Sequence, residues 1–127
     1  MKKIRALFLD VENAKKFETI DIVDYYEEYL KKMRIDTLDI VRRNIAGKPY
    51  QIVIDDCGAL YKDRVCSCED FQGYPALFGN IIITGLANDE GELTSLTLKD
   101  IEKITGKLVK RFSFVLGKQY YRVRLSK

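Results

Sequence analysis

The chain has 127 residues, a length typical of one domain, and its 46% hydrophobic and 32% charged content is ordinary for a folded globular protein. Its apolar runs are too short to cross a bilayer and no signal peptide is recognisable, so we expect a cytoplasmic protein with no membrane partner. Histidine is absent, which excludes Ser–His and Cys–His nucleophile pairs, and the three cysteines lack the spacing of a zinc site.

The first half of the chain predicts a strand, a helix and a hairpin. Ile4–Asp10 is rich in apolar residues and should form the first strand. Asp21 can cap a helix whose apolar stripe follows at spacings of four, four and three residues. This stripe consists of Ile22, Tyr26, Leu30 and Met33. Thr37–Arg43 and Tyr50–Ile54 then read as two strands joined near Gly47.

The second half predicts an irregular segment, a buried strand and a second helix. Tyr61–Tyr74 has little periodicity, whereas the unbroken apolar run in Asn80–Thr84 indicates a central strand that is buried on both faces. Thr97 and Asp100 form a capping-box pattern at the start of a helix that should end at Gly106. The residues of this helix expected to face inward are Leu98, Ile101 and Ile104.

The end of the chain predicts a basic hairpin formed by Lys107–Val115 and Gln119–Leu125. Because side chains alternate along a strand, Tyr120, Arg122 and Arg124 should share one face of it. We therefore expect a single α+β domain over residues 1–127, with a mainly antiparallel sheet, two helices packed on it and a basic C-terminal hairpin.

Positive charge is concentrated at the end of the chain, although the net charge is only +3. From Lys99 onward there are nine basic and two acidic residues, a net charge of +7, whereas the first 98 residues hold thirteen basic and seventeen acidic residues, a net charge of −4. This asymmetry indicates an anionic partner, which could be a nucleic acid, a nucleotide or an acidic protein.

Basic and aromatic residues on the hairpin have two interpretations. One is a solvated sheet edge that charge protects from aggregation. The other is a binding surface on which rings stack against bases while arginines contact phosphate. Lys110 and Arg111 beside Phe112 repeat the mixture on the first strand of the hairpin, which favours binding and makes Arg111, Arg122 and Arg124 candidate phosphate contacts.

A second group of candidates lies around the predicted central strand. Phe78 precedes Gly79, where a missing side chain would let a flat ligand approach the backbone. If the chain is extended from Phe78 onward, Phe78 and Thr84 share a face with Asn80. Asn88 can pair with a base edge, although its Asn-Asp-Glu-Gly context is equally typical of a turn.

Catalytic motifs are weak in this sequence. Asp55-Asp56 and Asp89-Glu90 stand beside glycines and read as turn residues, and neither a GxxxxGK[ST] nor a GxGxxG loop is present. We therefore predict a protein that is not an enzyme and that uses no cofactor or metal.

The sequence resembles the Thoeris anti-defence proteins of the first type, a group of small phage proteins called signal sponges, and a related uncharacterised family of small phage proteins. Four segments carry the resemblance, which is strongest over Phe78–Ile104. These segments are IRALFLD, IVRRNIAGKPYQIVIDD, LFGNIIITG and SLTLKDIEKI.

The resemblance implies binding without cleavage of cyclic ADP-ribose-type signals that bacterial immune enzymes make. It also implies assembly into homo-oligomers such as dimers or hexamers, action in the host cytoplasm, and in some members a separate site for cyclic di- or trinucleotides. The family's base-contacting aromatic residue would correspond to Phe78 and its ligand-binding asparagine to Asn88. The basic groups that neutralise phosphate come from the C-terminal region in that family.

The leading hypothesis is thus a phage anti-defence protein that sequesters glycocyclic ADP-ribose-type signals and so blocks bacterial immune effectors. An alternative is a nucleic-acid-binding or nuclease-inhibiting protein that acts through the basic hairpin. A weaker possibility is a hydrolase that uses one of the two carboxylate pairs.

Overall fold

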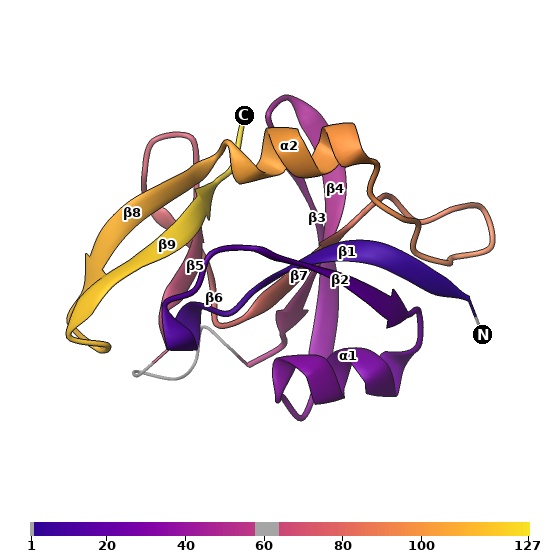
Figure 1. Ribbon diagram of the computed structural model, residues 1–127, viewed down its shortest axis with the longest axis horizontal. Helices are drawn as coiled ribbons and strands as arrows, with labels where there is room; N and C mark the ends of the chain where they lie inside the picture. Colours follow the sequence, from indigo (N-terminus) through magenta and orange to yellow (C-terminus); the bar gives the residue numbers. More distant parts are fainter. Residues whose placement is uncertain (1, 58–63) are drawn as a thin grey trace.

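The computed structural model describes residues 2–57 and 64–127, which form two helices, one 3-10 turn and two β-sheets (Figure 1). In chain order the elements are β1 (Lys3–Leu9), η1 (Val11–Asn13), β2 (Glu18–Val23), α1 (Tyr26–Met33), β3 (Leu38–Ile45), β4 (Lys48–Asp55), β5 (Cys66–Glu69), β6 (Pro75–Phe78), β7 (Ile81–Thr84), α2 (Leu98–Thr105), β8 (Leu108–Ser113) and β9 (Lys118–Arg124). The predicted α+β class is confirmed. The strands divide between a five-stranded sheet of order β2-β1-β7-β4-β3 and a four-stranded sheet of order β6-β5-β9-β8.

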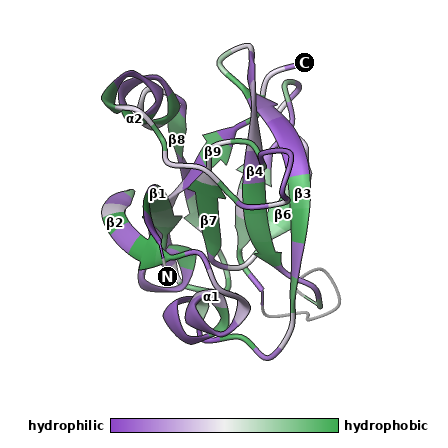
Figure 2. Ribbon diagram, turned by 90° about the vertical axis from the view of Figure 1, so that its right-hand side faces the viewer, coloured by the Kyte–Doolittle hydropathy of each residue, from purple (hydrophilic) through white to green (hydrophobic). Residues whose placement is uncertain are grey.

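The five-stranded sheet is antiparallel and has β7 at its centre, as the sequence predicts. All four residues of β7 are buried, and the strand is hydrophobic along most of its length in Figure 2. Ile82 packs with residues of β1, β2 and α1 on one face of the sheet. Ile81 and Ile83 belong to a second core on the other face, together with Ile104 of α2. Each helix therefore covers a different face of this sheet.

The start of the first helix differs from the prediction. Ile22 lies in β2 opposite Ile4 of β1, and Asp21 is an exposed strand residue, not a helix cap. The reason is that Thr19–Ile22 alternates polar and apolar residues, and this period of two extends the sheet. In α1 the buried residues are Tyr29 and Met33.

One strand, β5, lies where the sequence predicts irregular structure, and a second strand, β6, follows directly after that segment. Residues 61–63 of the predicted Tyr61–Tyr74 segment lie outside the described residues, but Cys66–Glu69 forms β5 and Pro75–Phe78 forms β6. β5 pairs in parallel with β9, and all four of its residues are buried, which removes the alternation of polar and apolar side chains that marks a strand. Gly79, with a φ of +82°, then separates β6 from β7, so Phe78 and Thr84 do not share one strand.

The second helix has the predicted start. The Thr97 hydroxyl accepts a hydrogen bond from the Asp100 backbone N–H, and the Asp100 carboxylate accepts one from the Thr97 backbone N–H. Ile104 is fully buried, but Leu98 is 72% exposed, so its predicted inward orientation is wrong. Leu98 is the first residue of α2.

The two predicted hairpins, β3–β4 and β8–β9, are both present with antiparallel register. Among the described residues, neither helix has the length and apolar character needed to cross a bilayer.

Candidate functional site

Three arginines from the basic hairpin converge on one buried carboxylate, and we call them the arginine cluster. Arg111 lies on β8, Arg122 and Arg124 lie on β9, and Glu69 is the last residue of β5. Glu69 is 0% exposed, and its Oε2 accepts hydrogen bonds from Arg111 Nη2 at 3.1 Å and Arg124 Nε at 2.9 Å. Arg122 Nη1 lies 3.5 Å from Oε1, and its Nε donates to the Tyr120 hydroxyl at 2.9 Å.

The sheet pairing explains why these residues meet. Glu69 stands opposite Arg124 in the parallel β5–β9 pair, and Arg111 stands opposite Tyr120 in the β8–β9 hairpin. Alternation then places Tyr120, Arg122 and Arg124 on the same face, as predicted. The sequence offers no sign of Glu69, because a parallel partner more than fifty residues away cannot be read from local pattern.

The arginine cluster carries more positive charge and more donors than Glu69 can satisfy. Three guanidiniums and one carboxylate leave a local net charge of +2, and each guanidinium has five N–H donors against the two oxygens of a carboxylate. The Arg111, Arg122 and Arg124 side chains remain 37%, 15% and 41% exposed. An anion at this surface could therefore take up the remaining donors while Glu69 holds the three side chains in place.

Phe78 lies on the same four-stranded sheet as the arginine cluster. It is half-buried, belongs to neither hydrophobic core, and stands opposite Cys66 in the β5–β6 pair. The preceding residue, Leu77, faces the core, so Phe78 points to the other side of the sheet. Burial raises the pKa of the Cys66 thiol, although the positive charge of Arg122 opposes this shift, which places Cys66 near the arginine cluster.

Asn88 lies at the opposite end of the molecule. It follows β7 in a loop and lines a small cavity of about 130 Å³ together with Lys2, which precedes β1, and Ile4, near the start of β1. Phe78 precedes β7, whose residue Ile81 pairs with Leu9 at the end of β1. Asn88 therefore lies near the start of β1 and Phe78 near its end. The seven residues of β1 span roughly 20 Å at about 3.4 Å per residue, so one small molecule cannot touch both side chains within one chain.

The hydrogen bonds of Asn88 are those of a turn residue. Its Oδ1 accepts from the backbone N–H groups of Glu90 and Glu92, each at 3.0 Å, and its Nδ2 donates to the Glu92 carboxylate at 3.3 Å. Thr84 is fully buried and donates its hydroxyl proton to the Gly85 carbonyl at 2.8 Å. The structure therefore brings Phe78 and the three arginines to one sheet but leaves Thr84 without accessible surface.

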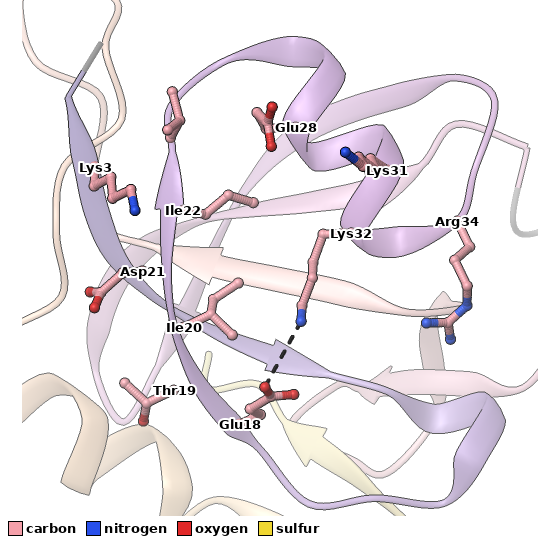
Figure 3. A pocket seen from close by; sticks show the side chains of 11 residues that line it. Lys3, Glu18, Thr19, Ile20, Asp21, Ile22, Glu28, Lys31, Lys32 and Arg34 are labelled. Carbon is pink, nitrogen blue, oxygen red and sulfur yellow. Dashed lines mark ion pairs between the residues drawn. The ribbon is translucent and has the colours of Figure 1, made fainter.

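A groove of about 680 Å³ between β2 and α1 was not anticipated from the sequence (Figure 3). Its lining includes four basic residues, Lys3, Lys31, Lys32 and Arg34, and three acidic residues, Glu18, Asp21 and Glu28. These charges almost cancel. Lys32 lies 3.9 Å from Glu18, and Arg34 contacts Asp10 at 3.2 Å. The groove therefore has less preference for an anion than the arginine cluster.

The two carboxylate pairs have different environments. Asp55 is buried and contacts the Arg64 guanidinium at 3.1 Å, whereas Asp89 and Glu90 are exposed in the loop that contains Asn88. Among residues 2–57 and 64–127, no group of three or more Cys, Asp or Glu side chains is placed to hold a metal ion.

The family described as a domain of unknown function (DUF3846) matches residues 4–109. This chain belongs to the DUF3846 family. The DUF3846 match extends from β1 to the start of β8, so the arginine cluster lies beyond the matched residues. No curated protein and no solved structure shows significant similarity to the chain.

Proposed function

We propose that this DUF3846 protein is a phage anti-defence protein that captures a cyclic ADP-ribose-type immune signal without converting it. The observation that carries the proposal is the arginine cluster, in which three guanidiniums share one buried carboxylate on the sheet that also presents Phe78. The resemblance to the Thoeris sponges supplies the class of ligand, and the matched family is itself of unknown function.

The chemistry of the site suits such a ligand. A cyclic ADP-ribose-type nucleotide carries a flat purine and a diphosphate. Phe78 provides a ring for the purine, and a base–aromatic stack contributes about 1–3 kcal/mol. The guanidiniums provide bidentate donors for the diphosphate, with each charge-assisted bond contributing about 1.5–3 kcal/mol. A few such contacts approach the roughly −12 kcal/mol of nanomolar binding.

Phe78 and Asn88 of one chain lie too far apart to contact the same ligand, so the proposed site needs residues from two copies of the protein. In a head-to-tail or two-fold assembly, the Asn88 loop of a second copy could close the site over Phe78. The Thoeris anti-defence proteins, which this sequence resembles, form such homo-oligomers. Asn88 would then act through a loop that its own hydrogen bonds already order. The proposal therefore requires assembly for tight capture.

The test is a depletion assay. We expect the purified protein to remove glycocyclic ADP-ribose from solution and to release the same compound, intact by liquid chromatography, after heat denaturation. Recovery of a cleaved product would contradict capture without conversion. If all of the ligand remained in solution before heating, binding would be contradicted.

Single substitutions at the proposed site, compared with a control substitution on the other sheet, test which residues bind the ligand. Phe78→Ala and Arg111→Ala should each weaken capture at least tenfold, because they remove a stacking ring and a phosphate donor. Arg42→Ala is the matched control, since Arg42 is an exposed arginine on β3 of the other sheet. Equal loss in Arg111→Ala and Arg42→Ala would indicate a general charge effect and would reject the arginine cluster as the site.

A further inference from the structure

The β8–β9 hairpin has a second face, opposite to the one that holds Glu69. In the register of the hairpin, Lys110 pairs with Tyr121 and Phe112 pairs with Gln119, so these four side chains project to the same side. The Phe114 ring lies against the Phe112 ring, and Lys16, from the segment after η1, lies over the Tyr121 ring. We call these six residues the aromatic–lysine face.

The phenylalanines of this face are unusually exposed. Phe114 is 94% exposed and Phe112 is 53% exposed, and their rings meet edge to face with centroids 5.2 Å apart. Figure 1 shows the β8–β9 hairpin projecting from the body of the molecule, with its turn at the far end. Exposed apolar groups of this size at a projecting turn are typical of an interaction surface.

Positive charge lies over one ring of this face, Tyr121, and no acidic residue of the hairpin neutralises it. Lys16 and Lys110 lie over the Tyr121 ring with their Nζ atoms 5.1 Å and 5.7 Å from its centroid. Residues 103–127 contain no aspartate or glutamate. The face therefore attracts anions, and it does so independently of the arginine cluster on the other side of the same strands.

We propose that the aromatic–lysine face binds single-stranded nucleic acid. This face presents three rings together with two lysines that lie over one of them. Such a mixture suits a chain that alternates flat bases with phosphates. Stacking requires bases whose faces are accessible, which a duplex does not offer. A second copy that met this face with its own hairpin would bring the same acid-free segment and be repelled. Lys110 and Lys16 lie over Tyr121, which is farther from the turn than the exposed phenylalanines, so a lipid surface is the competing occupant and the vesicle measurement described below decides between the two.

The experiment measures fluorescence anisotropy of labelled twelve-nucleotide oligothymidine and oligouridine, with a twelve-base-pair duplex for comparison. We expect binding of the single strands that weakens as salt rises, and weaker binding of the duplex. The double variant Phe112→Ala/Phe114→Ala should lose about tenfold or more in affinity, because both rings are removed while no core contact is lost. Circular dichroism establishes that the variant is folded.

The matched control is Phe71→Ala. Phe71 is a 48% exposed phenylalanine in the β5–β6 connection, and Lys127 lies 5.4 Å from its ring centroid, so it repeats the ring–lysine chemistry elsewhere on the surface. Its affinity should stay within about twofold of the wild type. The double variant Lys16→Ala/Lys110→Ala should reduce the salt slope by about 1.4, since each phosphate contact on a single strand contributes about 0.7.

Several results would overturn the proposal. These are unchanged affinity in the double phenylalanine variant, equal binding of duplex and single strands, or binding to vesicles of phosphatidylcholine and phosphatidylglycerol with no binding to oligonucleotides. Arg111→Ala separates the two faces, because it should impair capture of the cyclic nucleotide more than binding of oligothymidine. Failure of signal capture in the depletion assay would leave the oligonucleotide result unaffected.

Discussion

Replacing Glu69 with glutamine tests the arginine cluster most directly. The substitution keeps the size of the side chain but removes the only negative charge that touches the three guanidiniums among the described residues. The local net charge then rises from +2 to +3. Glu69 is 0% exposed, so water cannot replace it without a rearrangement of the sheet.

The expected loss of unfolding free energy follows from the burial of the partners. Breaking a buried ion pair typically costs about 3–5 kcal/mol because a charge is left uncompensated. Here the arginine side chains are 15% to 41% exposed and can turn partly towards water, which places the loss at the lower end, about 3 kcal/mol. Urea denaturation at pH 7 measures this difference.

Glu18→Gln is the matched control for Glu69→Gln. Glu18 and Lys32 form an ion pair 3.9 Å long with side chains 59% and 37% exposed, so the same chemical change should alter stability by no more than about 0.5 kcal/mol. Added sulfate should restore more stability to Glu69→Gln than to Glu18→Gln, because the freed guanidiniums can bind the anion. A loss below about 1 kcal/mol in Glu69→Gln, or equal sulfate effects, would refute the view that Glu69 holds the cluster in place.

Two further predictions concern groups outside the cluster. Burial alone would raise the pKa of the Asp100 carboxyl, but hydrogen bonds from Lys48, Thr97 and Tyr50 hold that pKa below its ordinary value. Asp100→Asn should therefore lose about 1–2 kcal/mol at pH 7, and urea titrations should show the gap to wild type closing as pH falls below about 4, where the unfolded carboxyl becomes protonated. A gap that stays constant with pH would contradict this. The second prediction concerns the thiols: the partly exposed Cys57 should react with a disulfide reagent in the native protein, whereas the two buried thiols of β5, whose pKa values burial raises, should react only after unfolding. Equal rates at all three sites would contradict the burial of β5.

Local pattern was sufficient for elements whose determinants lie close together in the sequence. The capping box of α2 needs only Thr97 and Asp100, and the β8–β9 hairpin needs only alternation and a glycine in its turn. The central position of β7 followed from an apolar run that suits burial on both faces.

Pattern was insufficient where distant pairing decides the structure. The β5 strand has no alternation because β6 and β9 enclose its edges and all four residues are buried, and its pairing with β9 bridges more than fifty residues. This pairing is what makes Glu69 the centre of the arginine cluster, so the sequence identified Arg111, Arg122 and Arg124 but not the group that organises them. The spacing of Ile22 from Tyr26 fits a helical period and so predicts a helix, but Ile22 lies in a strand.

The placement of Phe78 and Asn88 shows a similar limit. The two residues are ten positions apart in the sequence, yet β7 runs between them and carries them to opposite ends of the molecule. Sequence proximity cannot reveal whether a strand or a loop separates two side chains.

The position of β9 in the order β6-β5-β9-β8 has a consequence for synthesis of the protein. The strand that joins the two halves of this sheet is the last of its four strands to be synthesised, and the Leu125 backbone N–H then has to reach the Glu69 carbonyl. Until then β5 has an open edge, and nascent chains are exposed to mispairing with one another. Folding of the four-stranded sheet should therefore wait for synthesis of β9, and a stalled chain ending before residue 118 should be the form that chaperones bind.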